Sequence, residues 1–320
     1  MNPQLEHLER LVTALRENLA LCLPGNERQE PSVDAIHDVR TGTRRIEAQL
    51  DAMLRDTRDE NLASAIAGWQ RLLKKLRRAA APARDLDVQR KILEKLVKRE
   101  AGEETAEEAA TAAQADDLDA WLRHARTERS GKLQKRAGKW SEEIAECWRA
   151  VQTAAAQASP RASRKDSSRE SKAQRAARVA LEAFARLSLE MQQLYAENLH
   201  DFRKGAKKAR YMAESGGEDE YSGAVGKALK KLQDEIGDWH DWLVLADEAA
   251  SVLGEQGREL VAKIESERDR RYALALAAAE RMRGQLMGEW QAVSPGKRVA
   301  KKRVAETRVA GALPIPSGSG

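Results

Sequence analysis

A short motif centred on a histidine occurs twice in this chain, and this repetition constrains the fold more than any other feature. The first copy is IHDVRTGTRRI at 36–46, and the second is LHDFRKGAKKA at 199–209. In both copies apolar residues recur at helical spacing, so each copy predicts an amphipathic helix. Because the two histidines stand 163 positions apart, at 37 and 200, the chain is predicted to contain two versions of one helical unit.

A second pair of segments supports this duplication. The segment LKKL occurs at 73–76 and again at 229–232, which is an offset of 156 positions. The same offset aligns Arg84-Asp85 with His240-Asp241, and a loop difference of seven residues accounts for the change from 163. Runs such as LKKL are common on amphipathic helices, but the order and spacing of both segments together are difficult to obtain by chance.

Each motif helix is predicted to carry a cationic face opposite an apolar face. At about 100° per residue, His37, Arg40 and Arg44 fall on one side of the first helix, and Val39 and Ile46 fall on the other. The second helix divides in the same way. Solvated helices usually mix acidic and basic residues three or four positions apart, whereas each motif has a single Asp against three or more cations. A solvated surface remains one interpretation, but the repeated excess of like charge favours a binding face for an extended polyanion.

The composition favours an all-α protein. Alanine, leucine, lysine, arginine and glutamate dominate the 320 residues, only eight residues are proline, and 42% are hydrophobic, which is enough to form a core. Cys22 and Cys147 show neither paired spacing nor a CxxC motif, as is typical of a reducing compartment. The N-terminal stretch lacks the apolar segment of a signal peptide, and no apolar run approaches membrane-spanning length. We therefore expect a soluble protein of the cytoplasm that does not bind membranes.

Interruptions in the helical pattern divide the chain. Pro82 is predicted to end one helix, and separate helices are predicted at about 219–236 and 239–253, which leaves a break at 237–238. The stretch QASPRASRKDSSRESKAQRAAR is rich in Ser, Arg and Lys and predicts a linker. We expect an N-terminal helical half at 1–157, a linker at 158–172, a C-terminal helical half at 173–291 and a disordered basic tail at 292–320.

Four segments of the sequence resemble the CHAD family, the conserved histidine α-helical domain. They are HDVRTGTRR at 37–45, ARDLDV at 83–88, HDFRKGAKKARY at 200–211 and LQDEIGDWHD at 232–241, and the likeness covers roughly residues 5–291. The resemblance implies two pseudo-symmetric helical bundles with a central basic groove that binds inorganic polyphosphate. The chain departs from the family pattern at His240, where arginine is more typical, and at 79–82, which lacks the expected Leu-Gly.

The resemblance and the cationic faces together select candidate ligands of polyphosphate. This polymer offers neither base nor sugar, so its recognition depends on charge and on hydrogen-bond donors, which arginine and lysine supply. We expect no catalytic residue, no metal and no cofactor, and we expect inorganic polyphosphate, free or in polyphosphate granules, as the partner. The candidate residues are His37, Arg40, Arg44, Arg45, Arg71, Lys74, Lys75, Arg78, Arg84, His200, Arg203, Lys204, Lys207, Lys208, Arg210, Lys227, Lys230, Lys231 and His240.

The roles of the two motif histidines, His37 and His200, stay open at this stage. We favour phosphate donors, although structural, metal-binding and catalytic roles are also compatible with the sequence. Nearby cations disfavour protonation of a histidine in the free protein, whereas a bound phosphate favours the imidazolium form. Binding of the ligand and uptake of a proton are therefore expected to be linked.

Other motif residues have a structural interpretation and a functional one. Gly42 and Gly205 stand five residues after each histidine, where glycine costs a helix roughly 1 kcal/mol relative to alanine. Close helix packing is the favoured reason, and backbone approach to a ligand is the alternative. The aspartates of the motifs are interpreted as partners of nearby arginines or as helix caps. Trp239 and Trp242 are interpreted as packing residues, because polyphosphate has no ring on which they could stack.

Two other classes of function remain possible on the sequence. Three His-Asp dipeptides, at 37–38, 200–201 and 240–241, could belong to a metal-dependent phosphohydrolase of the HD class, although the surrounding cations would repel a metal ion. His7 and His124 lie in no recognisable ligand pattern. A nucleic-acid-binding module is the other alternative, but no segment resembles a base-reading helix or an aromatic platform for single strands.

Overall fold

The computed structural model describes residues 3–25, 30–100, 106–158, 171–214 and 219–293. Within these ranges every regular element is helical and no strand occurs, so the prediction of an all-α fold is confirmed. The helices of this part of the chain are α1 (Pro3–Ala20), α2 (Val33–Asp56), α3 (Glu60–Glu100), α4 (Ala106–Gln157), α5 (Lys172–Glu190), α6 (Ala196–Glu214), α7 (Glu220–Leu253), the 3₁₀ helix η1 (Gly254–Gly257) and α8 (Arg258–Val293).

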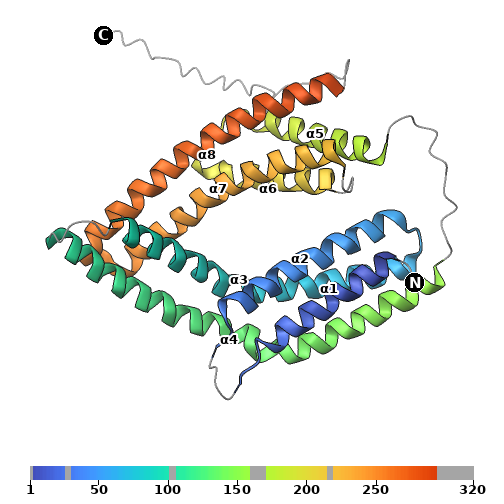
Figure 1. Cartoon of the computed structure of the whole chain (residues 1–320), viewed down its shortest axis with the longest axis horizontal. Coiled ribbons are helices and arrows are strands. Elements are labelled where there is room, and N and C mark those ends of the chain that lie inside the picture. Colours follow the sequence, from blue (N-terminus) through green and yellow to red (C-terminus); the bar gives the residue numbers. More distant parts are fainter. Residues whose placement is uncertain (1–2, 26–29, 101–105, 159–170, 215–218, 294–320) are drawn as a thin grey trace, which may run out of the picture.

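Three hydrophobic cores organise these helices. The first lies among α1, α2, the beginning of α3 and the end of α4, around the fully buried Trp69. The second lies among α5, α6, the beginning of α7 and the end of α8, around Phe184 and Phe202. The third, which we call the joined end, combines the remaining parts of α3, α4, α7 and α8. Two helical bundles thus share one end and diverge away from it (Figure 1).

Both of the helix breaks predicted at Pro82 and Gly237 are wrong. Pro82 lies inside α3, and α7 continues without interruption through Gly237. Proline removes a backbone donor and usually ends or kinks a helix, but Ala83, immediately after it, is fully buried and holds α3 against its neighbours. In α7, Ile236 and Trp239 are both buried. Tertiary packing therefore overrides the local preference at both positions.

The boundaries of the two halves fall only partly within the described residues. α5 begins after Ser171, which forms a capping box with Gln174, whereas residues 159–170 of the predicted linker lie outside the described ranges. α8 continues to Val293, so the first two residues of the predicted tail are helical, and the rest of that tail is also outside these ranges. The duplication and the division into halves stay predictions. None of the described helices is long and apolar enough to span a membrane.

A buried ion pair fixes the start of α2, the helix that carries the first motif. Arg126 of α4 donates to Asp87 of α3 at 2.6 Å and to the Pro31 carbonyl at 2.8 Å, and it lies 3.0 Å from the Glu30 carboxylate. The side chain of Arg126 is 3% exposed and that of Asp87 is fully buried. Because Pro31 immediately precedes Ser32, the N-cap of α2, this cluster sets the position at which α2 begins.

The motif glycines lie where helices pack closely. A Cβ at Gly205 would lie 2.6 Å from Cδ1 of Leu187 in α5, and a Cβ at Gly42 would lie 3.4 Å from Cδ1 of Leu15 in α1. Each glycine therefore faces the preceding helix of its own bundle. This geometry supports the packing interpretation of both glycines.

Candidate functional site

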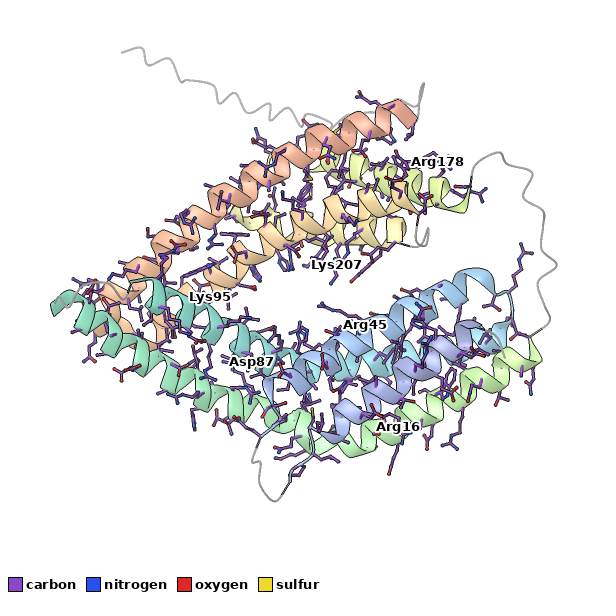
Figure 2. The ribbon with its side chains drawn as sticks, viewed as in Figure 1. Arg16, Arg45, Asp87, Lys95, Arg178 and Lys207 are labelled. Carbon is purple, nitrogen blue, oxygen red and sulfur yellow. The ribbon has the colours of Figure 1, made fainter. Side chains whose placement is uncertain are left out.

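Cations of the two bundles approach one another between α2 and α6. Arg45 and Lys207 lie on the sides of these helices that face each other (Figure 2). Burial, and then the positive charge of Arg44 on α2, lower the pKa of Lys207 on α6 to about 8. Cationic side chains from the two bundles are therefore close enough to repel one another.

The pKa of Arg44 on α2 is lowered for the same reasons as that of Lys207 on α6. Arg44 is accessible to solvent, yet partial burial lowers its pKa, and the charges of Arg40, Arg77 and Arg203 lower it further. The pKa of Lys207 responds in turn to Arg44, Arg203, Arg210 and Arg77. We call these five cations the facing cluster, and its members are Arg44, Arg77, Arg203, Lys207 and Arg210.

Two members of the facing cluster have acidic partners. Arg77 lies 2.8 Å from Glu47, and Arg210 lies 3.1 Å from Glu214. Arg77 was not among the residues predicted from the sequence. It follows Lys74 by three positions on the same face of α3, and this spacing was the signal that could have identified it.

Arg44 and Lys207 have no carboxylate within ion-pair distance in the part of the chain that the structure describes. An aromatic ring lies beside Lys207 instead, because Nζ is 5.7 Å from the ring centre of Tyr211, which also lies 4.9 Å from Cζ of Arg210. A cation–π contact at an exposed site is worth only about 0.5–1 kcal/mol. The facing cluster therefore retains an excess of positive charge.

Two motif arginines brace the helices of their own bundle. Nε of Arg203 donates to the carbonyl of Gln233 in α7 at 3.0 Å, and its guanidinium lies over Gly237, where a Cβ would be only 2.7 Å from it. Arg40, at the equivalent motif position, donates to the carboxylate of Asp85 in α3 at 2.8 Å. Each arginine thus holds its motif helix against the next helix, and it has fewer donors left for a ligand.

His200 and His240 lie together beside Arg203. The centres of the two imidazole rings are 4.8 Å apart, and Nδ1 of His200 is buried with no hydrogen-bond partner among the described residues. Burial lowers the pKa of His200, and Lys204 and Arg203 lower it further. Burial also lowers the pKa of His240, with added effects of His200 and Arg203. Both rings are therefore held in the neutral form more strongly than a free histidine.

His37 occupies a different environment from its counterpart His200. It is exposed, and its Nε2 lies 3.5 Å from the hydroxyl of Thr41. In addition, the described residues include no group of three or more His, Cys, Asp or Glu side chains arranged to hold a metal ion.

The remaining candidates are distributed around the facing cluster. Lys204 pairs with Asp201 at 2.9 Å, and Lys230 pairs with Asp234 at 2.6 Å. Within the described ranges the other candidates form no ion pair, and only one of them, Arg84, is half-buried. These cations are Arg45, Arg71, Lys74, Lys75, Arg78, Arg84, Lys208, Lys227 and Lys231.

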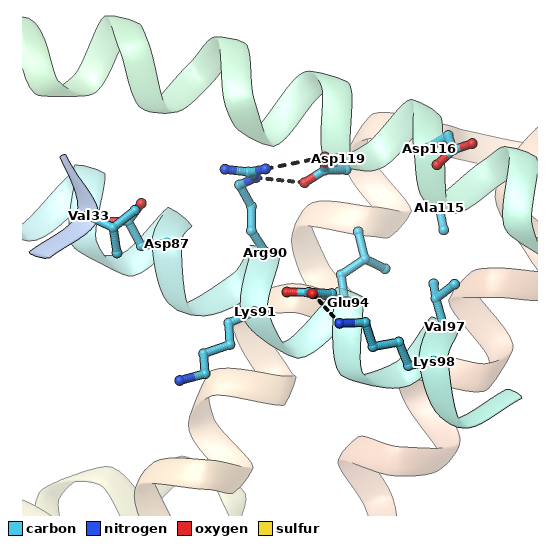
Figure 3. A pocket seen from close by; sticks show the side chains of 11 residues that line it. Val33, Asp87, Arg90, Lys91, Glu94, Val97, Lys98, Ala115, Asp116 and Asp119 are labelled. Carbon is cyan, nitrogen blue, oxygen red and sulfur yellow. Dashed lines mark hydrogen bonds and ion pairs between the residues drawn. The ribbon is translucent and has the colours of Figure 1, made fainter. Parts of the chain in front are cut away.

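A cavity of about 460 Å³ lies between α3 and α4, beside the start of α2 (Figure 3). In its wall Arg90 pairs with Asp119, and Lys98 pairs with Glu94, both at 2.6 Å. Most of its charges are thus matched within the wall, and it includes no member of the facing cluster. We assign no ligand to this cavity.

The fold and the charge distribution define an all-α protein of two bundles that share one end and bring cations together where they face each other. The CHAD domain matches residues 6–250, which is more than half of the chain, and the protein therefore belongs to the CHAD domain family. The match includes both motif copies and ends near the end of α7. The resemblance predicted from the sequence is thus confirmed.

Two solved structures are similar to this chain. PptA from Streptomyces chartreusis has 17% sequence identity and a TM-score of 0.51, and the alignment covers 88% of this chain and 99% of PptA. The CHAD domain from the plant Ricinus communis has 20% identity and a TM-score of 0.42, with 90% and 85% covered. At 17% identity the likeness to PptA shows the fold alone. No curated protein matches the chain.

Proposed function

We propose that this protein binds inorganic polyphosphate, without catalysis, in a cationic groove between the two bundles. The facing cluster supports this proposal most directly, because burial and mutual repulsion lower the pKa values of Arg44 and Lys207, and no carboxylate of the described residues pairs with either. A bound polyanion would compensate these charges. We further propose that the protein acts in the cytoplasm, free or at polyphosphate granules.

The cations of the facing cluster repel one another in the free protein. Like charges at short distance raise the energy of the empty site, and partial burial weakens the screening by solvent. An anion bound between α2 and α6 would attract each of these cations, and these attractions would offset the repulsion between them. Because Lys207 has a pKa of about 8, a bound phosphate would also keep this side chain fully protonated in mildly alkaline solution.

The distribution of the cations favours a long ligand over a compact one. α2 has 24 residues and is therefore about 36 Å long. Candidate cations follow this helix and continue on α3, α6 and α7, so one small anion could contact only a few of them. An extended chain of phosphates could contact cations from both bundles at once, and it requires no base-reading or sugar-binding residue.

The test is a calorimetric titration with polyphosphates of defined length, alongside pyrophosphate, ATP and duplex DNA. Long chains should bind far more tightly than pyrophosphate. If six to ten phosphates are engaged, raising the salt concentration from about 50 to about 200 mM should weaken binding by roughly three to five orders of magnitude, because condensed counterions are released on binding. Equal affinities for pyrophosphate and long chains, or a flat salt dependence, would contradict the proposal.

The same titration distinguishes the two other classes of function. Preference for duplex DNA over polyphosphate at matched charge concentration would favour a nucleic-acid-binding module. Bound divalent metal in the purified protein, together with release of phosphate from the titrant, would favour a phosphohydrolase. Tight binding with intact polyphosphate recovered after incubation is the expected result.

A further inference from the structure

One position makes the two halves differ where their motif histidines lie. The offset of 156 that aligns the two LKKL segments also aligns His240 of α7 with Arg84 of α3 in the sequence. The first half therefore has a permanent cation at a position where the second half has a titratable ring. That ring lies 4.8 Å from His200, the histidine of the second motif.

We propose that the His200–His240 pair is a phosphate-binding subsite that takes up a proton together with its ligand, so that acidification tightens polyphosphate binding. This inference rests on the proposed function. It adds to that function a pair of histidines that take up a proton when the ligand binds, and this pair occurs in the second half alone.

The geometry of the pair opposes protonation in the free protein. The rings are half-buried and tilted by 42° to one another, so a proton on one ring places its charge beside the other. Arg203, which is braced over Gly237 by its bond to Gln233, supplies a permanent positive charge next to both rings. The described residues offer no hydrogen-bond acceptor to the buried Nδ1 of His200, and an unpaired donor of a charged ring is costly.

Two of the carboxylates near the rings, which could stabilise an imidazolium, are already engaged. Asp201 faces His200 from the same helix, but it accepts a hydrogen bond from Lys204 at 2.9 Å. Asp85 faces His240 from α3, but it accepts one from Arg40 at 2.8 Å. Neither of these two carboxylates is therefore free to act as the counterion of a second positive charge. A phosphate group placed against the rings would supply that counterion.

The direction of the pH effect follows from this arrangement. The pKa of each ring lies below its usual value of 6.5 in the free protein, because burial and neighbouring positive charges favour the neutral form. A bound phosphate raises that pKa, so the complex holds more protons than the free protein between the two pKa values. In that interval, each proton taken up increases the affinity about tenfold for each unit by which the pH falls. Below the free-protein pKa the rings are charged in both states, and their contribution is constant.

Two other groups titrate in or near this interval. Burial raises the pKa of Asp241, which lies next to His240 in the chain and also senses Arg203, Asp85, Asp238 and Arg84, to about 6. Its protonation removes a negative charge and would tighten binding in the same pH range. Lys207, with a pKa of about 8, contributes mainly above neutral pH. The pH dependence must therefore be assigned with variants, not from its position alone.

The experiment is calorimetric titration with long-chain polyphosphate at constant ionic strength, from about pH 5.5 to about pH 7.5. Two buffers with different ionisation enthalpies give the number of protons taken up. The wild-type protein should gain roughly tenfold in affinity per unit of acidification for each proton bound. In His240→Arg, the dependence of affinity on pH should fall by about half or more. This variant should still bind tightly at the alkaline end, because arginine is charged over the whole pH range of the titration.

Three further variants keep the test decisive. His240→Gln removes the same titration without adding charge, and it replaces His240→Arg if that variant unfolds. Asp241→Asn measures how much of the pH dependence of binding comes from Asp241. His124→Gln removes an exposed histidine of α4 that lies 3.6 Å from Glu128, and it should leave the slope unchanged. A wild-type slope in both His240 variants would overturn the inference and leave polyphosphate binding intact, whereas absence of binding at every pH would overturn both.

Discussion

The joined end and the facing cluster use arginine in opposite ways. At the joined end Arg99 and Arg270 lie 2.8 and 2.7 Å from Glu267, whose side chain is 10% exposed. The hydrogen bond from Arg270, and then that from Arg99, lower the pKa of Glu267 to about 2 against the effect of burial. In the facing cluster, Arg44 and Lys207 have no such partner among the described residues.

This difference separates charges that hold the molecule together from charges that are available to a ligand. An arginine paired with a buried carboxylate of another helix has donors occupied and holds the two helices together. An unpaired cation beside others contributes repulsion instead and gives nothing to the stability of the fold. Because the buried charges at the joined end are paired, the unpaired charges of the facing cluster require a separate explanation, and the proposed polyanionic ligand would supply it.

The largest expected effect comes from reversing the charges of the facing cluster. Arg44→Glu combined with Lys207→Glu should weaken polyphosphate binding by more than about a hundredfold, because each charge-assisted contact contributes about 1.5–3 kcal/mol and each new carboxylate repels the ligand. Each single reversal should cost more than the corresponding change to alanine. Titration with long-chain polyphosphate at constant salt measures the loss.

A matched control tests whether location or total charge is responsible. Lys135 and Arg136 are exposed on α4, outside the facing cluster, and neither forms an ion pair in the described ranges. Lys135→Glu with Arg136→Glu changes the net charge by the same amount and should leave most of the affinity. If both double variants lose affinity equally while circular dichroism shows them folded, binding depends on overall charge and the facing cluster is not the site.

The next effect concerns stability instead of binding. Asp87→Ala would leave the buried guanidinium of Arg126 without its carboxylate, and breaking a buried pair by removing one partner costs about 3–5 kcal/mol. Urea unfolding should show this loss, whereas Asp117→Ala, an exposed change on the same helix as Arg126, should stay within about 0.5 kcal/mol. The folded fraction of Asp87→Ala should still bind polyphosphate. A stability change below about 1 kcal/mol would mean that this pair does not anchor α2.

Local patterns in the sequence predicted the motif helices and their buried faces. Val39 and Ile46, and likewise Phe202 and Ala206, are fully buried at the positions that helical periodicity predicted. The pattern failed at Pro82 and Gly237, because burial by distant segments decided whether those helices continued. Propensity describes an isolated segment, and neither position is isolated in the fold.

Spacing on the helix could have added Arg77 to the candidates, but it could not show which of the many cations meet across the two bundles. Lys75 was a candidate and Arg77 was not, yet Lys75 lies about 160° away from Arg77 around the axis of α3 and only Arg77 is coupled to Lys207. Which cations meet depends on the angle at which the two bundles diverge. That angle is set by packing at the joined end, around residues such as Trp242 and Leu245, and no motif in the sequence encodes it.

The smallest expected effects distinguish helix packing at the motif glycines from ligand binding at the facing cluster. A Cβ at Gly205 would lie 2.6 and 2.7 Å from the two methyl groups of Leu187, whereas a Cβ at Gly42 would lie 3.4 Å from Leu15. Overpacking costs about 1–3 kcal/mol, and replacing a helical glycine by alanine returns up to about 1 kcal/mol. Gly205→Ala should therefore destabilise the protein, and Gly42→Ala should be neutral or slightly stabilising in urea unfolding.

The interpretation of Gly205 can be tested by removing its neighbour. In a Leu187→Ala background the clash is absent, so adding Gly205→Ala should raise the free energy of unfolding instead of lowering it. Polyphosphate affinity should be the same in Gly42→Ala, Gly205→Ala and the rescued double variant, because both glycines face the helix behind them and not the facing cluster. If affinity falls in a variant whose stability is intact, the backbone at that glycine approaches the ligand, and the alternative interpretation of the motif glycine is correct.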